Sequence, residues 1–176
     1  MTATKERSTA PAPAEYSEYF ARYVGRVPPG DVVATIRDQS ADSMTLLRGV
    51  DPSRTTTGYA PGKWSIRDIV LHMADTERVM GYRALHIARA DVTPLPSFDE
   101  NAWTPMAGAN ARSMESLLAE FEATRRSTVA MLEGLPPEAW TRIGTASGKP
   151  VSVRALAWII AGHERHHLAI IRERYL

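Results

Sequence analysis

The chain has 176 residues, of which 44% are apolar and none is cysteine; this composition fits a single hydrophobic core and excludes a disulfide framework or a cysteine nucleophile. Its 21 basic and 20 acidic residues give a net charge of +1, and no basic cluster could follow a phosphate backbone, so nucleic acid is not an expected partner. No segment approaches the roughly 18 uninterrupted apolar residues of a membrane span, so no membrane association is expected.

The N-terminal part of the chain is expected to contribute a tail and one helix. Residues 1–15 mix charged residues with Ala, Thr and Pro and lack the apolar centre of a signal peptide. We therefore expect a flexible tail in a cytoplasmic protein, followed by one domain over residues 16–176. The first helix is predicted over Asp31–Arg48, where apolar residues recur near one face and Gly49 ends the pattern.

A second helix is predicted over Ser65–Arg89, because Ser65 and Asp68 resemble a capping box ahead of an amphipathic segment. Imidazole nitrogens bind Zn, Ni, Cu and Fe, so His72 on this helix is a candidate metal ligand and His86 is the second choice. The two lie roughly 21 Å apart along the helix axis and cannot bind the same ion. Arg83, on the same face within about 40°, is a candidate clamp for a substrate carboxylate or phosphate.

The link from residue 90 to residue 112 is longer than a bundle hairpin needs, as are the links at 49–64 and 134–151. It contains the run Asp99-Glu100-Asn101-Ala102-Trp103. Because long loops often carry function, we interpret this segment as a lid or substrate-binding wall over the bundle end, with Trp103 as a candidate substrate contact. The alternative is that Trp103 anchors a long crossover on the core.

Two further helices complete the predicted bundle. One begins at Ser113 and ends before Gly134, and the other covers Ser152–Tyr175. No stretch shows sustained alternation with a period of two, so no β-sheet is expected. The predicted class is an all-α four-helix bundle, antiparallel, with long crossover loops.

The last helix carries the run Gly162-His163-Glu164-Arg165-His166-His167. His163 and His167 are four residues apart, so one nitrogen from each ring can reach a single ion. Both lie on the apolar stripe, where an unpaired ring would cost roughly 1–3 kcal/mol, which disfavours a purely structural pair. His166 lies about 60° from His163 on the helical wheel and is assigned to solvent or to a supporting position beside the site.

The same run matches the H-E-x-x-H pattern of zinc metallopeptidases, in which the Glu is the general base. Ile170 and Glu173 stand where the extended pattern requires Gly and His, and nine residues follow His167. A third ligand must therefore come from upstream, and His72 is the candidate. A di-iron carboxylate bundle is disfavoured as well, because it needs a second Glu-x-x-His motif.

Four short motifs occur in an order that resembles the DinB/YfiT-like superfamily: Trp64-Ser65, Leu71-His72-Met73-Ala74-Asp75-Thr76-Glu77, Phe98-Asp99-Glu100-Asn101-Ala102-Trp103 and His163-x-x-His166-His167. The resemblance covers about residues 30–176. It implies a four-helix bundle, often a homodimer, in which His72, His163 and His167 bind a divalent metal. Known members include thiol S-transferases and a thiol-dependent isomerase, so a low-molecular-weight thiol is one implied partner.

The expected function is that of a mononuclear metal-dependent enzyme that activates a small thiol or water to attack a small-molecule substrate. We expect one divalent metal per chain, with Zn or Ni as first choices and Fe or Mn as alternatives. Glu164 is a candidate base for hydrolysis, although its position also suits a surface ion pair with Arg165 or Arg172. The alternative function is a non-catalytic, metal-stabilised dimeric bundle that binds a small ligand or a protein partner.

Overall fold

In the computed structural model, which describes residues 5–176, four long helices form the predicted bundle. They are α3 (Val32–Arg48), α4 (Ile66–Ala88), α6 (Met114–Glu133) and α7 (Val153–Arg174). Each helix begins one residue after a capping residue whose side chain accepts a backbone N–H bond; the caps are Asp31, Ser65, Ser113 and Ser152. The predicted capping box of Ser65 and Asp68 is formed, and the four-helix-bundle class is confirmed.

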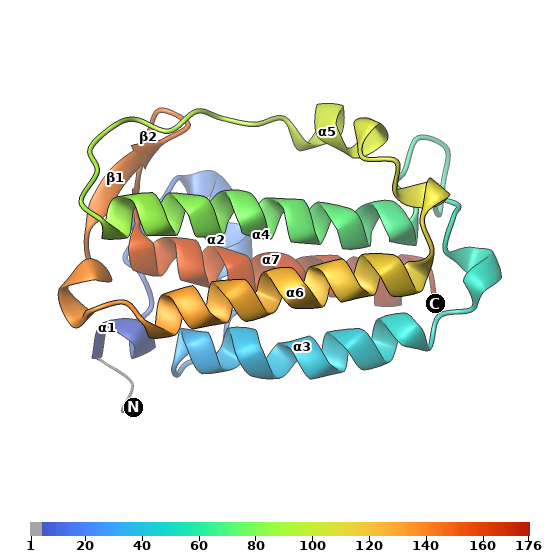
Figure 1. The fold of residues 1–176 in the computed structure, drawn as a ribbon, viewed down its shortest axis with the longest axis horizontal. Coiled ribbons are helices and arrows are strands. Elements are labelled where there is room, and N and C mark those ends of the chain that lie inside the picture. The colour runs from blue at the N-terminus through green and yellow to red at the C-terminus, as the bar shows by residue number, and fades with distance from the viewer. Residues whose placement is uncertain (1–4) are drawn as a thin grey trace.

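The helices are antiparallel in some pairs and parallel in others. α3 and α7 run in one direction along the bundle, whereas α4 and α6 run in the other (Figure 1). The pairs α3–α6 and α4–α7 are therefore antiparallel, and α4 packs against the parallel helix α6 as well. A parallel pair is possible because the crossover from residue 89 to residue 113 returns the chain along the length of the bundle before α6 begins (Figure 1).

A short hairpin, which the sequence analysis does not predict, precedes α7. Its strands are β1 (Ile143–Ala146) and β2 (Lys149–Ser152), paired antiparallel. The two turn residues, Ser147 and Gly148, have φ values of 53° and 70°, the left-handed pair that a two-residue hairpin turn requires. Strands of four residues are too short to show an alternating pattern in the sequence, which explains why the hairpin escaped prediction.

The crossover contains the short helix α5 (Glu100–Met106) and is fastened to the hairpin. Leu95 donates its N–H to the carbonyl of Thr145 and accepts a bond from the N–H of Ser147. Short 3-10 helices lie at Pro13–Glu15, Glu18–Phe20, Pro52–Arg54, Ala109–Ala111 and Pro137–Ala139. The crossover and the hairpin together form one side wall of the bundle.

The N-terminal segment packs on the bundle through α1 (Lys5–Ser8) and α2 (Ala21–Val24). Arg7 forms an ion pair with Asp31 at 2.6 Å, and Glu15 forms one with Arg154. This differs from the flexible tail expected for residues 1–15, because charges that the composition assigns to solvent have partners far along the chain. Residues 1–4 of that expected tail lie outside the described residues.

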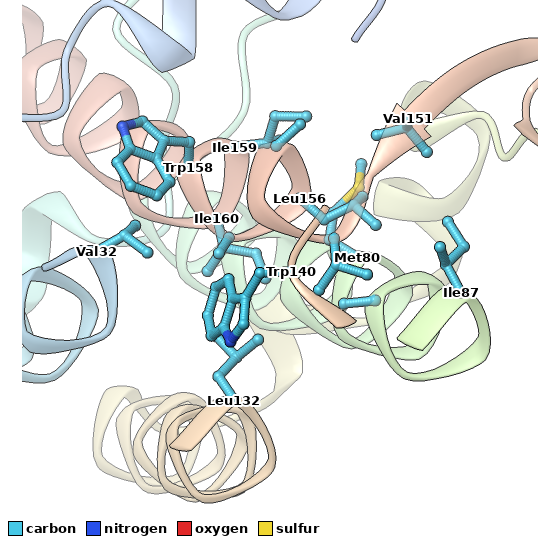
Figure 2. Packing of buried hydrophobic residues seen from close by; sticks show 14 of the residues in the cluster. Val32, Met80, Ile87, Leu132, Trp140, Val151, Leu156, Trp158, Ile159 and Ile160 are labelled. Atoms are coloured by element: carbon cyan, nitrogen blue, oxygen red, sulfur yellow. The ribbon is translucent and has the colours of Figure 1, made fainter. Parts of the chain in front are cut away.

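The apolar core has two parts along the bundle axis. One part surrounds Trp140 and Trp158 near the hairpin, with contributions such as Val32 from α3, Leu132 from α6 and Ile160 from α7 (Figure 2). The other part lies toward the opposite end, where Leu117, Phe121 and Ile171 are among its members. None of the described helices is both long and apolar enough to span a membrane.

Between these two apolar parts, each long helix contributes buried polar side chains. We call this set the polar layer; it comprises Gln39 and Ser43 of α3, His72, Thr76 and Glu77 of α4, Thr124, Arg125 and Thr128 of α6, and His163, Glu164 and His167 of α7. Side-chain hydrogen bonds connect members from all four helices. Because polar groups are costly to bury without partners, this layer is where a functional site is expected.

Candidate metal centre

Three buried imidazoles from α4 and α7 converge in the polar layer. Nε2 of His163 lies 3.0 Å from Nε2 of His72 and 3.1 Å from Nε2 of His167. One ligand atom from each ring lies within 4.8 Å of the others. In a tetrahedral site with Zn–N bonds of about 2.0–2.1 Å, ligand nitrogens lie about 3.3 Å apart. The spacing of these three nitrogens therefore suits a small ion held between them.

The three rings are neutral near pH 7. Burial lowers the pKa of His72 to about 4. Burial, together with the neighbouring histidines, lowers the pKa values of His163 and His167 well below 6.5. Neutral imidazole is the form that binds a metal, so the environment favours ligation without prior loss of a proton.

The hydrogen bonds available to the cluster do not satisfy its nitrogens. Nε2 of His163 lies within hydrogen-bonding distance of two other Nε2 atoms, but a ring nitrogen carries either one N–H or one lone pair, so it cannot form a well-aligned bond with both. Nδ1 of His167 is also buried with no hydrogen-bond partner among the described residues. Buried polar atoms usually have a partner, and an ion bound between the rings would be that partner for the Nε2 lone pairs, although not for Nδ1 of His167.

Neighbouring side chains orient the rings. Oγ1 of Thr76, one turn further along α4, lies 3.4 Å from Nδ1 of His72. The Trp64 ring lies 4.7 Å from the His72 ring, and the Tyr23 ring contacts His163 edge-on at 5.3 Å. Contacts on the far side of a ligand ring fix its orientation and tautomer, so the convergence of the Nε2 atoms is built into the fold.

Gly162 explains how α2 reaches the site. A Cβ atom at this position would lie 1.9 Å from the carbonyl oxygen of Tyr23, so the close approach of α2 to α7 requires glycine. A glycine inside a helix costs about 1 kcal/mol relative to alanine, and the packing of α2 offsets this cost. Tyr23 was not predicted from the sequence, because α2 spans four residues and is too short to show a helical pattern; the glycine directly before His163 was the available signal.

A cavity of about 440 Å³ opens beside His72 and His163. Its lining is mostly apolar and comes from the N-terminal segment, α4, the crossover, the hairpin and α7. The charged lining residues are Arg83, Glu100 and Lys149. A mostly apolar cavity of this size with a few polar groups is typical of a small-molecule site.

The two predicted substrate contacts have different positions. Arg83 lines the cavity and is 4% exposed. Trp103 is 48% exposed, packs against Phe98 with ring centroids 5.1 Å apart and does not line the cavity. Trp103 lies outside the lining of this cavity, and Phe98 is the crossover aromatic that lines it; the substrate contact predicted for Trp103 stays a prediction.

His86 and His166 lie outside the three-ring cluster. Nε2 of His86 lies 3.0 Å from the carbonyl oxygen of Thr93, far from His72 along α4. His166 is half-buried, and its ring centroid lies 5.3 Å from that of Tyr23. Burial and the nearby Arg26 lower the pKa of His166. The position at the edge of the stripe that the sequence indicated for His166 agrees with this placement.

Glu164 does not face the cavity and is not a surface residue, being 2% exposed. Its carboxylate accepts hydrogen bonds from three side chains of α3 and α6: Gln39, Ser43 and Arg125. The surface ion pair with Arg165 or Arg172, considered as the alternative to a role as base, is not formed, because the carboxylate turns into the bundle. The same bonds hold Glu164 away from the position of a general base at the histidine cluster.

Arg125 joins Glu164 to a second buried carboxylate, that of Glu77. Its guanidinium lies 2.8 Å from each carboxylate, and all three side chains are at most 4% exposed. Burial alone would lower the pKa of Arg125, but the carboxylates of Glu164 and Glu77 raise it above its ordinary value. The partners of Arg125 lie 39 and 48 residues away in the sequence, so no local sequence signal indicates them.

Sequence comparison relates the chain to proteins associated with metals. The sequence pattern of the DinB superfamily matches residues 35–171. A protein of Oceanobacillus iheyensis named "Putative metal-dependent hydrolase" is 28% identical over 143 residues, covering 80% of this chain and 79% of the relative. A protein of the same name from Geobacillus kaustophilus is 26% identical over 141 residues, 78% of each chain.

Comparison with solved structures gives the same fold. YfiT of Bacillus subtilis, a four-helix bundle of unusual topology, aligns with a TM-score of 0.67 at 18% identity and covers 94% of this chain and 91% of its own. The mycothiol-dependent maleylpyruvate isomerase aligns with a TM-score of 0.64 at 17% identity, over 82% of this chain and 61% of the isomerase. Because the family pattern extends from α3 to α7, this chain belongs to the DinB superfamily.

Proposed function

We propose that this protein is a metal-dependent enzyme in which His72, His163 and His167 bind one divalent ion beside the cavity. The observation that carries this proposal is the meeting of three neutral, buried Nε2 atoms, 3.0 and 3.1 Å from one another about His163. Three imidazoles suit Zn or Ni best and also accept Fe or Mn. The names of the relatives from Oceanobacillus and Geobacillus support a metal-dependent activity.

A divalent ion held by three imidazoles supplies a Lewis acid that lowers the pKa of water or of a thiol. The chain supplies the remaining requirements. Thr76, Trp64 and Tyr23 hold the rings in place, and the mostly apolar cavity walls give the substrate a surface to pack against. Glu164 takes no part as a base, because its oxygens are bound to α3 and α6.

The nucleophile in this proposal is a small thiol or water, and the comparisons support each choice. The relatives' names support hydrolysis, in which water attacks. The structural likeness to a mycothiol-dependent isomerase supports a low-molecular-weight thiol. Because the chain contains no cysteine, a thiol would have to enter the cavity as a substrate.

The cavity favours this proposal over the non-catalytic, metal-stabilised bundle. A structural ion is closed on all sides by protein ligands, whereas a catalytic site keeps an open position. His72 and His163 line the cavity, and among residues 5–176 three side chains are candidate ligands of the ion. A four-coordinate ion bound by these three histidines would therefore keep one coordination position for a ligand that enters from the cavity.

Elemental analysis of the purified protein tests the proposal. Wild type from metal-supplemented medium should carry about one divalent ion per chain. Single replacement of His72, His163 or His167 by Ala should abolish binding, whereas His86→Ala, on the same helix as His72, should retain it. Metal-free wild type, or loss of metal in His86→Ala alone, would contradict the assignment. Turnover assays for ester or amide hydrolysis and for thiol transfer then follow with the metal-loaded protein.

A further inference from the structure

We propose that Arg83 binds an anionic group of the substrate, so that the enzyme acts on small acids whose apolar body lies between Arg83 and the histidine cluster. This inference rests on the proposed metal-dependent function and specifies its substrate class. Three observations support it: Arg83 has no carboxylate partner among the described residues, it lines the cavity, and Arg125, which is similarly buried, has two carboxylate partners.

Arg83 is a buried cation without a counter-ion. It is 4% exposed, and its bonds run to neutral acceptors: the Pro96 carbonyl at 2.6 Å, Ser147 Oγ at 3.1 Å and, more weakly, Met80 Sδ at 3.8 Å. No carboxylate among residues 5–176 forms an ion pair with it. Buried charges are normally paired, so the pairing of Arg83 is incomplete.

The unpaired guanidinium lies at the cavity. Arginine has five N–H donors in a planar fork, the arrangement that binds carboxylate or phosphate through two bonds. The bonds of Arg83 to neutral acceptors use Nη1 and Nη2 and leave Nε free. Arg83 is a lining residue, as is the exposed Lys149, while the carboxylate in the lining, Glu100, does not pair with Arg83. This end of the cavity is therefore suited to an anion.

The cavity connects Arg83 with the histidine cluster. His72, Thr76, Met80 and Arg83 follow one another on the cavity-lining face of α4, and the first and last are about 16 Å apart along the axis at 1.5 Å per residue. The opposite wall is apolar and includes Phe20, Leu156 and Ile159. A substrate that reaches both ends must therefore combine an acidic group with an apolar middle.

Arg125 shows what a structural arginine looks like in the same bundle. It is 3% exposed, similar to Arg83, yet it pairs with the carboxylates of both Glu77 and Glu164. The fold can thus neutralise a buried guanidinium completely. The lack of such a partner at Arg83, beside a cavity, points to a partner that arrives from outside.

Binding of two matched probe series to the metal-loaded protein tests the proposal. One series consists of ω-mercaptocarboxylic acids of four to eight carbons, and the other of the corresponding ω-mercaptoalcohols. The thiol is a soft ligand for the ion, and the far end carries either a charge or a neutral hydroxyl. With Co²⁺ as the bound metal, the thiolate absorption band reports occupancy of the histidine site, and titration gives the Kd of each probe.

We expect at least one acid to bind roughly tenfold tighter than its alcohol, in line with charge-assisted pairing. In Arg83→Met this preference should disappear, because the Kd of the acid should rise by a larger factor than the Kd of the alcohol. Arg78→Met is the matched control, because it removes the same charge from an exposed position on α4 and should keep the preference.

Equal binding of acids and alcohols by wild type at every length would overturn the inference without requiring any variant. Retention of the acid preference in Arg83→Met, or failure of every acid to bind, would also overturn it. Failure of the proposed function gives a different result, since the protein would then hold no Co²⁺ at the histidines and show no thiolate band with either series.

Discussion

The polar layer contains two clusters that are both buried but differ in how completely hydrogen bonds and ion pairs within the protein satisfy their polar atoms. In the charged cluster, Arg125 binds the carboxylates of Glu77 and Glu164. The Glu164 carboxylate also accepts hydrogen bonds from Gln39 and Ser43. In the histidine cluster, three neutral rings face one another and Nδ1 of His167 has no described partner. His163 and Glu164 are neighbours in the sequence, yet one belongs to an open cluster and the other to a closed one. Burial alone does not identify a functional site; incomplete bonding beside a cavity does.

Breaking the closed cluster should have the largest effect. Arg125→Met leaves the carboxylates of Glu77 and Glu164 buried without their cation, and we expect a loss of about 3–5 kcal/mol in the free energy of unfolding. Urea denaturation measures it. Arg126→Met is the control, because that side chain is 67% exposed and lies 3.6 Å from Glu122, so it should lose less than about 1 kcal/mol. Similar losses in both variants would mean that the charged cluster is not a structural element.

Two adjacent substitutions separate the clusters directly. Glu164→Gln keeps the shape but loses a charge-assisted bond to Arg125, so it should cost about 1.5–3 kcal/mol and still bind metal. His163→Ala should lose the metal and leave a folded bundle. Metal content, circular dichroism and urea unfolding are measured for both variants. Loss of metal from Glu164→Gln would show that the charged cluster is needed for metal binding at the histidine cluster.

Disturbing the packing of α2 should weaken the open cluster from its outer side. Gly162→Ala drives a Cβ into the Tyr23 carbonyl, and overpacking of this kind costs about 1–3 kcal/mol. Metal affinity should fall with stability, because Tyr23 supports His163. Gly49→Ala is the control, since the atoms nearest to its added Cβ would be 3.5 Å away. Thermal unfolding measures both variants, and a lower Tm for Gly49→Ala than for Gly162→Ala would contradict the close approach of α2 to α7.

A partly exposed ion pair outside the polar layer should give the smallest effect. Burial alone would raise the pKa of Glu15, but bonds from Arg154, the Ala12 N–H and Ser152 lower it from 4.5 to about 2. Since the folded-state pKa is the lower one, this contribution is present above pH 4.5 and is lost as the pH falls toward 2. Glu15→Gln should cost about 1 kcal/mol at pH 7, and should flatten the pH dependence of stability between pH 4.5 and 2.

The helices could be predicted because their signals are local. Asp31, Ser65, Ser113 and Ser152 each stand directly before an amphipathic run, and each is the observed cap. Spacing on one helix also indicated that His163 and His167 share a face. The hairpin depends on two left-handed turn residues between strands of four residues, and such short strands leave no period to detect.

The parts that could not be predicted depend on contacts between distant segments. Nothing near Arg125 in the sequence indicates that its partners are Glu77 and Glu164. The same limit applies to Glu164, whose position on the helical wheel suited either a surface ion pair or a base. The homodimer and the cytoplasmic location stay predictions.

Anomalous diffraction from crystals of the metal-loaded protein tests the central claim most directly, because it locates the ion itself. We expect one strong peak about 2.0–2.1 Å from Nε2 of His72, His163 and His167, with the carboxylates of Glu77 and Glu164 bound to Arg125 as they are here. A peak elsewhere, such as between His86 and Asp91, whose side chains lie 3.4 Å apart, or on the Glu164 carboxylate, would contradict it.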